Sequence, residues 1–278
     1  MPKRIIQSKQ NARLKDLRRA LTKPGLEANG FAGIEGANLL QEALRSRLRV
    51  PCIFVADDAE DLLDGMPIPL DTEILLLSRA LLDSVLQTET PQPVAALVEV
   101  PDWTLAHVLG PGKSSAPLIV ILAGLQDPGN LGTILRSAEA FGASGIIALP
   151  GTVSPWNPKA VRASAGSVFR MPMIATTAEE CFSLLHQAGV RTMTTTVRAA
   201  QPVDICVLSG GIAFLIGNEG SGVPANVAAH ADEAITIPCP GAVESLNAAV
   251  AASVLLYEAS RQRQAASGAP SDRRGSVR

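Results

Sequence analysis

The chain has 278 residues, of which 47% are apolar and 18% are charged, and its formal net charge is −2. This composition is that of an ordinary globular protein, and it excludes fibrous, collagen-like and wholly disordered chains. No stretch approaches the roughly 20 uninterrupted apolar residues of a membrane span, and the polar N-terminal residues do not match a signal peptide, so we expect a cytoplasmic protein without membrane contact.

The first fifty residues are basic and the next fifty are acidic. Residues 1–49 carry eleven basic side chains against four acidic ones, whereas residues 50–100 carry one arginine against ten carboxylates. Most basic side chains of the first stretch cluster together: Lys3, Arg4, Lys9, Arg13, Lys15, Arg18, Arg19 and Lys23. Such a density attracts polyanions, so the charge indicates either a nucleic-acid surface or a solvated helix face.

Residues 1–100 are predicted to form a small α/β domain. Leucines at helical spacing predict a helix over 11–21, which Pro24-Gly25 stops. A second, amphipathic helix is expected over 36–44. Apolar runs predict strands over 30–34, 51–56, 73–77 and 94–98.

Residues 101–117 are predicted to be a linker, because prolines, glycines and serines are frequent there and apolar periodicity is weak. Gly112-Lys113-Ser114 resembles the end of a phosphate-binding loop. A nucleotide triphosphatase is nevertheless excluded, because His107 occupies the place of the first glycine of that signature and no strand precedes it.

Residues 118–263 alternate apolar strands with helical segments, which predicts an α/β domain with a mostly parallel sheet covered on both faces. Strands are expected over 118–125, 145–149, 170–174, 191–197, 212–216 and 233–237. Helices are expected over 131–141, 158–165, 178–188, 224–229 and 246 to about 263, the last with an apolar stripe of Leu246, Ala249, Val250, Ser253, Val254 and Tyr257. The remaining tail, residues 264–278, is expected to be disordered.

Four cysteines and three histidines are too scattered for a disulfide framework or a metal site. The cysteines, which we expect to be buried or unreactive, are Cys52, Cys181, Cys206 and Cys239. The sequence therefore predicts no bound metal.

A first polar, glycine-bearing segment covers residues 126–142. Pro128-Gly129 turns the chain, and Asn130 is expected to cap the helix that follows. Arg136 then lies within two turns of the helix start, where a cation is electrostatically disfavoured. Arg136 is therefore either a functional cation or a solvated surface residue.

A second such segment covers residues 215–223. It holds three glycines in six positions, Gly217, Gly220 and Gly222, which leave backbone groups open to a ligand at close range. The order of these glycines does not match the dinucleotide-binding motif. Glu219 between them is interpreted as a helix cap, an ion-pair partner or a functional acid.

A third segment covers residues 237–251. Two prolines and a glycine form an irregular loop, after which Ser245 or Asn247 opens a helix of small residues. An N-cap is the structural interpretation of Ser245. The alanines at the helix start allow close approach of another backbone or a ligand.

These three segments resemble, in their order and separations, the signature motifs of the SpoU family of RNA ribose 2'-O-methyltransferases, part of the knotted SPOUT superfamily. The patterns are N-x-G-x-x-x-R-x-A-x-x-F-G, I-G-x-E-G-x-G and I-P followed by S-L-N, and the resemblance covers residues 118 to about 262. Residues 1–100 are also similar to the L30e-like RNA-binding domain, in segments 9–15, 34–36 and 88–92.

The resemblance implies a two-domain enzyme. Its parts are an L30e-like substrate-binding domain (1–100), a linker (101–117) and a SPOUT methyltransferase domain (118–263) with a deep trefoil knot. The implied cofactor is S-adenosylmethionine, held by Thr195, Gly217, Gly222, Ile237 and Leu246. The implied RNA-binding residues are Lys9, Arg13, Lys15, Arg18 and Arg19.

The implied catalytic residues are Arg136, Asn130, Glu219, Ser245 and Asn247. Because an arginine has a pKa above about 12, it is a poor general base, and Arg136 is expected to contact the reacting ribose or its phosphate and to lower the pKa of the hydroxyl. Whether Arg136 also accepts the proton stays open. Glu219 is the alternative base or an anchor for Arg136, and Asn130 positions the nucleotide or organises the turn.

The resemblance also implies a homodimer formed through the C-terminal domain. The expected activity is methylation of a ribose 2'-hydroxyl in structured RNA, with ribosomal RNA as the first candidate. Two alternatives remain, which are a transfer-RNA 2'-O-methyltransferase and a non-catalytic RNA-binding protein of ribosome assembly.

Overall fold

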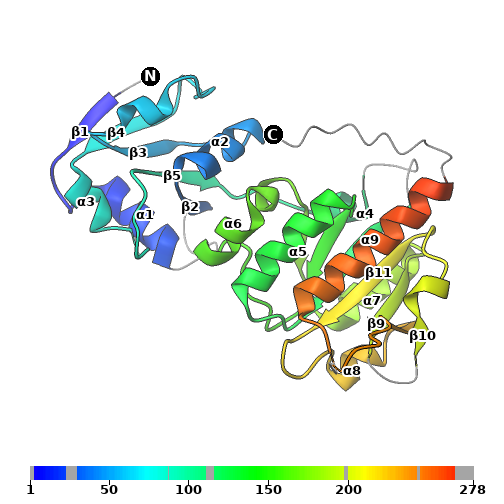
Figure 1. Cartoon of the computed structure of the whole chain (residues 1–278). Helices are drawn as coiled ribbons and strands as arrows, with labels where there is room; N and C mark the ends of the chain where they lie inside the picture. The colour runs from blue at the N-terminus through cyan, green and yellow to red at the C-terminus, as the bar shows by residue number, and fades with distance from the viewer. Residues whose placement is uncertain are drawn as a thin grey trace. The chain divides into compact units, whose positions relative to one another are not determined.

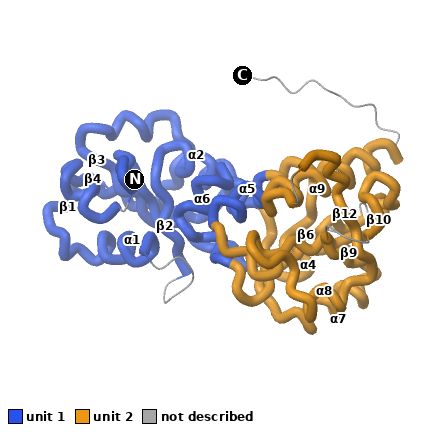
Figure 2. The backbone as a smooth tube through the Cα atoms, turned by 60° about the horizontal axis from the view of Figure 1, so that its bottom comes forward, with its two compact units in different colours: residues 1–102, 128–136, 153–170 blue, residues 103–127, 137–152, 171–278 orange. Residues whose placement is uncertain are grey.

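The computed structural model describes residues 3–22, 30–86, 88–110, 116–196, 200–242 and 245–266. Lys23, the predicted helix stop at Pro24-Gly25, Val197 and residues 267–278 of the predicted tail lie outside these ranges. The chain divides into two compact units (Figure 2): unit 1 is residues 1–102, 128–136 and 153–170, and unit 2 is residues 103–127, 137–152 and 171–278. Two segments expected in the C-terminal domain thus group with the N-terminal residues.

Unit 1 contains a mixed five-stranded sheet in the order β1-β4-β3-β5-β2 (Figure 1). The strands are β1 (Lys3–Ile6), β2 (Phe31–Glu35), β3 (Cys52–Ala56), β4 (Glu73–Leu77) and β5 (Val94–Glu99). Strands β1 and β3 run parallel to β4, whereas β5 is antiparallel to β2 and β3. The four predicted strands are present, and β1 is an addition.

The helices of the N-terminal part of unit 1 are α1 (Ala12–Thr22), α2 (Ala37–Arg45), α3 (Arg79–Asp83) and the 3-10 turn η1 (Glu60–Leu63). The leucine spacing that predicted α1 has its expected consequence, because Leu14, Leu17 and Leu21 are buried. They join one apolar cluster with Leu82 of α3 and with β3 and β4. Unit 1 also holds α6 (Pro158–Ser164), η2 (Ser167–Phe169) and the start of α5 (Pro128–Ala140).

Unit 2 is built on a seven-stranded sheet in the order β10-β12-β9-β11-β6-β7-β8, and every neighbouring pair is parallel. The strands are β6 (Leu118–Ala123), β7 (Gly145–Ala148), β8 (Met173–Ala175), β9 (Arg191–Thr195), β10 (Gln201–Pro202), β11 (Ile212–Gly217) and β12 (Glu233–Thr236). The predicted parallel sheet is confirmed. Strand β8 begins at Met173 and not at the expected residue 170, because residues 167–169 form η2.

Helices cover both faces of this sheet, as predicted (Figure 1). On one face lie α4 (Leu105–Leu109), α7 (Ala178–Gln187) and α8 (Ala225–Ala228), whose apolar side chains join a cluster with Ile121 and Leu215. Helix α9 (Ala248–Ala266) packs against β11. The 3-10 turn η3 (Val203–Ile205) precedes β11.

Two expectations for unit 2 are wrong. Residues 105–109 of the supposed linker form α4, whose Val108 is so close to β7 that a Cβ on Gly145 would lie 2.7 Å from the Val108 Cα. The buried side of α9 consists of Ala249, Ala252, Leu255, Leu256 and Ala259, whereas the predicted stripe leaves Val250, Val254 and Tyr257 exposed. The helix also extends to Ala266, past the predicted start of the tail.

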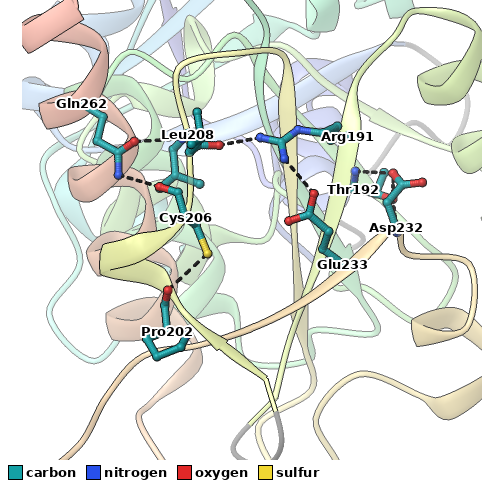
Figure 3. Close-up of polar contacts among 9 residues, drawn as sticks. Arg191, Thr192, Pro202, Cys206, Leu208, Asp232, Glu233 and Gln262 are labelled. Carbon is teal, nitrogen blue, oxygen red and sulfur yellow. Dashed lines mark hydrogen bonds and ion pairs between the residues drawn. The ribbon is translucent and has the colours of Figure 1, made fainter.

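Hydrogen bonds connect the C-terminal end of α9 to the loop before β11 (Figure 3). The Gln262 amide donates to the Cys206 carbonyl at 3.0 Å and accepts from the Leu208 N–H at 2.9 Å. The neighbouring Arg263 guanidinium donates to four backbone carbonyls, those of Ala116, Pro117, Leu208 and Gly210. These bonds fix the C-terminal end of α9 to the loop before β11 and to the start of β6.

Candidate functional site

A pocket of about 680 Å³ lies at the carboxyl ends of β9, β11 and β12 in unit 2. Ligands of open α/β sheets bind at this edge. The pocket is lined by Thr195, Thr196, Ile216, Gly217, Asn218, Glu219, Gly220, Ser221, Gly222, Thr236, Ile237, Pro238, Cys239, Ser245, Leu246, Ala248 and Ala251. The second and third sequence segments, which are more than ten residues apart, therefore meet in one pocket.

The loop after β11 is closed by backbone bonds of Asn218. Its N–H donates to the Gly222 carbonyl at 3.0 Å, and its carbonyl accepts from the Gly222 N–H at 2.9 Å. The Asn218 side chain accepts from the Gly220 N–H at 2.9 Å and donates to the Gly124 carbonyl at 3.1 Å. Asn218, which the sequence did not single out, is the residue that organises this loop and ties it to the end of β6.

Gly217 and Gly222 are required by the shape of the same loop. A Cβ at Gly217 would lie 2.0 Å from the Gly222 carbonyl carbon and 2.2 Å from the Val223 nitrogen, where no side chain fits. Gly222 has a φ of +68°, which residues with a Cβ adopt only with strain. The glycines that were predicted to leave backbone groups open to a ligand are thus also required by close contacts and backbone conformation within the loop.

Glu219 connects the second segment to the first. Its carboxylate accepts from the Asp127 N–H at 3.2 Å and from the Gln126 N–H at 3.5 Å, the two residues that precede α5. The donors belong to the turn before α5, so these bonds favour an anchoring role of Glu219 at that turn.

Asn247 caps helix α9. Its side-chain oxygen accepts from the Ala249 N–H at 2.9 Å and the Val250 N–H at 3.2 Å, and its carbonyl accepts the first helical bond from the Ala251 N–H. The N-cap interpretation of Ser245 is therefore wrong. Ser245 is exposed and lines the pocket beside Leu246.

The structure brings together the five residues expected to hold a cofactor, because Thr195, Gly217, Gly222, Ile237 and Leu246 all line the pocket. The Thr195 hydroxyl donates to the Leu215 carbonyl at 2.9 Å and so joins β9 to β11. Sequence reasoning missed lining residues such as Thr236 and Ala251. Their signal is positional, since each lies at a strand end or in the first turn of α9.

Asn130 and Arg136 lie on α5, in the part that belongs to unit 1. Helix α5 starts at Pro128, so Asn130 is inside the first turn and is not the expected N-cap. A proline at the first helical position explains the shift, because its fixed φ suits the helix start. Arg136 is exposed, and Asn130 is half-buried.

The expected RNA-binding residues lie on and just before α1. The five side chains of Lys9, Arg13, Lys15, Arg18 and Arg19 are all exposed. Arg13 pairs with Glu73 at 3.3 Å, whereas the other four have no acidic partner among the residues that the structure describes. The charge of this surface is thus largely uncompensated.

Two absences hold for the described part of the chain. There, no group of three His, Cys, Asp or Glu side chains is placed to hold a metal ion. None of its helices is long and apolar enough to cross a membrane.

Cys239 is expected to react with a thiol reagent much faster than the other cysteines. It is exposed and lines the pocket, whereas the other three cysteines, all four of which were expected to be buried or unreactive, are buried. Burial raises the pKa of Cys52 and of Cys181 to about 12, and it also raises that of Cys206. Since the thiolate is the reactive form, Ellman's reagent at pH 8 should show one fast thiol in the native protein, which Cys239→Ser removes. Two fast thiols, or a fast thiol that survives this substitution, would contradict the placement.

Residues 117–257 match the model of the family described as SpoU rRNA Methylase. The 23S rRNA (guanosine(2553)-2'-O)-methyltransferase RlmP of Bacillus subtilis is 34% identical over 254 residues, with 91% of this chain and 97% of the relative covered. The 23S rRNA (guanosine-2'-O-)-methyltransferase RlmB of Coxiella burnetii is 34% identical over 199 residues, with 70% and 80% covered. The solved SpoU methyltransferase AviRb of Streptomyces viridochromogenes, in complex with AdoMet, is 28% identical with a TM-score of 0.78, covering 91% of this chain and 98% of that one.

Proposed function

The chain belongs to the SpoU rRNA methylase family, and from this premise we propose that it transfers a methyl group from S-adenosylmethionine to a ribose 2'-hydroxyl of ribosomal RNA. The observation that carries the proposal is the pocket in which the glycine loop after β11 meets the segment before α9. Family membership also supports the deep trefoil knot expected for the C-terminal half. A ribosomal substrate further supports a cytoplasmic location.

The pocket fits the proposed cofactor. Its volume of about 680 Å³ lies within the roughly 300–1,000 Å³ range of small-molecule sites. Backbone groups of the glycine loop, three threonines and apolar side chains line it, a mixture that suits an adenosine joined to an amino acid. When bound, S-adenosylmethionine supplies a sulfonium methyl that is already activated for displacement. The cofactor is accordingly expected to slow the reaction of Cys239 with thiol reagents.

We assign the residues of the reaction as follows. The Arg136 guanidinium contacts the reacting ribose or its phosphate and lowers the pKa of the attacking hydroxyl, because a fixed cation stabilises the developing negative charge on oxygen. Glu219 holds the turn before α5 through the Gln126 and Asp127 N–H groups. Asn130 positions the target nucleotide.

The third segment contributes through the start of α9. By capping α9, Asn247 fixes Ser245 and Leu246 at the wall of the pocket. The Ser245 hydroxyl is thereby available to contact the ribose. We place Asn247 as a structural residue of the site and Ser245 as a contact residue.

We propose 23S rRNA as the substrate and guanosine as the modified nucleoside, as in the names of RlmP and RlmB. Ribose-methylation mapping in cells with and without this chain tests this proposal. Loss of one 2'-O-methylguanosine from 23S rRNA is expected. Loss of a methyl from transfer RNA would favour the tRNA enzyme, and an unchanged map would favour the non-catalytic assembly protein.

The L30e-like N-terminal part is proposed to hold the RNA through its basic surface. Replacing Lys15, Arg18 and Arg19 with alanine is expected to weaken binding of a 23S rRNA fragment about 10- to 100-fold at 100 mM salt. The slope of log affinity against log salt should flatten by about 2, because each lost phosphate contact removes most of one released counterion. Filter binding measures both the affinity and its salt dependence.

The matched control replaces Arg49, Arg79 and Arg261, which pair with carboxylates, with alanine. These substitutions change the net charge equally and should leave the affinity within about 2-fold.

We propose that the homodimer forms through the exposed side of α9. Val250, Val254 and Tyr257 are 49%, 37% and 55% exposed at helical spacing, which is unusual for a solvated helix surface. Phe141, the residue directly after α5, extends this apolar stripe, since its ring meets Tyr257 edge-on with the ring centroids 5.7 Å apart. Sedimentation at micromolar concentration should show a dimer for the native chain and a monomer for Val254→Asp with Tyr257→Asp. Ile205→Asp, at another exposed apolar side chain of unit 2, should stay dimeric. A monomeric native chain would refute the proposal.

A further inference from the structure

Arg136 is built into the same compact unit as the basic surface. The boundary between the two units falls within α5, directly after Arg136. Residues 128–136 group with the N-terminal sheet, whereas Ser137 groups with unit 2 and meets Ser253 of α9 at 2.7 Å. The contacts that fix the first two turns of α5 therefore also fix the position of Arg136.

The first contact in this arrangement is between α5 and α6. A Cβ at Gly132 would lie 2.5 Å from the Ala160 carbonyl oxygen and 2.5 Å from the Ala163 Cβ. Only a glycine allows the two helix backbones to approach this closely. Gly132 of the first motif thus allows close helix packing. Through this contact, α6 determines the position of α5 one turn before Arg136.

The second contact joins the segment after α6 to α2. The Arg170 guanidinium donates to Glu42 Oε2 at 3.0 Å and to the Ser46 hydroxyl at 2.9 Å. Gly166, at a φ of +91°, lies so close to α2 that a Cβ there would be 2.8 Å from the Glu42 Cβ. Glu42 is therefore held by close packing and by two ion pairs, with Arg170 and, at 3.2 Å, with Arg45 of the same helix, and its side chain is only 29% exposed.

The segment between these two contacts is rigid enough to connect them. Asn157 caps α6 by accepting from the Lys159 N–H at 2.9 Å, and η2 follows the helix after the two left-handed residues Ala165 and Gly166. The rings of Trp156 and Phe169, both buried, stack with their centroids 6.2 Å apart and close the segment on itself. A displacement at Arg170 is therefore expected to reach α6 and Gly132.

We propose that Glu42 and Arg170 are positioning residues for catalysis, because they fix α6, and through it Arg136, to the unit that holds the RNA. The inference rests on the proposed function, in which Arg136 contacts the reacting ribose. RNA bound on α1 and the guanidinium on α5 are then held by the same unit. The target ribose therefore meets a cation whose position is fixed relative to the bound RNA. Displacement of a reacting group by about 1 Å can lower a reaction rate about 100-fold. Breaking the partly exposed ion pair between Glu42 and Arg170 is therefore expected to lower the methylation rate measurably.

Exchange of the two charges tests the proposal in the full-length protein. Glu42→Lys and Arg170→Glu each place like charges together, and both are expected to lower kcat for 23S rRNA methylation about 10-fold while the Kd for S-adenosylmethionine stays unchanged. Lysine keeps the Cβ and Cγ that pack on Gly166. The double variant restores the pair in reverse and should return kcat to within about 3-fold of the native value. Arg49→Glu, which breaks the exposed pair with Glu99 in the same unit, is the control and should leave kcat unchanged.

Two results would overturn the proposal. One is a kcat of the single variants equal to that of the native chain. The other is a kcat of the double variant reduced by the product of the two single reductions. Hydrogen–deuterium exchange over residues 128–136 and 158–164 gives a second readout that does not depend on activity. Exchange should be faster in each single variant and native-like in the double variant. If the native chain transfers no methyl, the proposed function fails, and unchanged exchange in the single variants would then still refute the positioning role.

Discussion

Replacing Arg136 with alanine is expected to lower kcat for methyl transfer by about 1,000-fold. Loss of the guanidinium removes the fixed cation that stabilises the attacking ribose oxygen. The Kd for S-adenosylmethionine should stay within about 2-fold, because Arg136 is not among the residues that line the pocket. Single-turnover transfer of a labelled methyl group and titration calorimetry measure the two quantities.

The controls for this experiment separate charge from shape. Arg136→Lys keeps the charge but lacks the planar fork that contacts two oxygens at once, so an intermediate loss of about 30- to 100-fold is expected. Arg162→Ala removes another exposed arginine of unit 1, on α6, and should be neutral. Native turnover by Arg136→Ala would exclude the proposed role of this residue.

Replacing Gly217 with alanine is expected to weaken S-adenosylmethionine binding by more than about 100-fold. The new methyl group would lie 2.0 Å from the backbone of Gly222, so the loop has to open and the wall of the pocket moves. Gly220→Ala is the matched control in the same loop, because its Cβ would meet only the Asn218 side-chain oxygen, at an ordinary 3.6 Å. Calorimetry should find binding within about 3-fold of native for Gly220→Ala. Tight binding by Gly217→Ala would show that the loop is not the wall of the cofactor site.

The parallel sheet of unit 2 could be predicted because buried strands carry unbroken apolar runs, as in Leu118–Ala123, and alternate with capped helices. The missed elements are short. Strand β10 has two residues, and α3 and α4 have five each, which is too few to display a periodicity. Tertiary contacts, such as that of Val108 with Gly145, stabilise such elements, and α4 additionally has a local capping box formed by Thr104 and His107.

The buried side of α9 could not be predicted, because the helix is apolar on more than one side. Alanines and valines occupy most of its first two turns, so a helical wheel cannot separate the side that meets β11 from the side that stays exposed. Residue size does not separate the two sides either, because Leu255 and Leu256 are buried together with Ala249 and Ala252, whereas the smaller Val254 is exposed. The packing of α9 against β11 decides which side is buried.

The residues of the candidate pocket could be predicted better than their roles. Glycines after a strand indicate a backbone-lined loop, and both Gly217 and Gly222 line the pocket. The role of Glu219 depends on bonds to residues 92 and 93 positions away, at Asp127 and Gln126, which no local pattern reveals. Asn130 was misassigned as a cap for a local reason, since Pro128 already starts α5. Of the two residues considered for the start of α9, Ser245 and Asn247, the structure has Asn247 as the cap.

The central claim is that this chain methylates a ribose oxygen of 23S rRNA. Its most direct test combines the purified native chain, unmodified 23S rRNA and S-adenosylmethionine with a labelled methyl group, followed by digestion to nucleosides and mass spectrometry. We expect label in one nucleoside, 2'-O-methylguanosine, at about one methyl per RNA, and none with Arg136→Ala. Label on a base in place of the ribose, or no transfer to RNA by the native chain, would contradict the account.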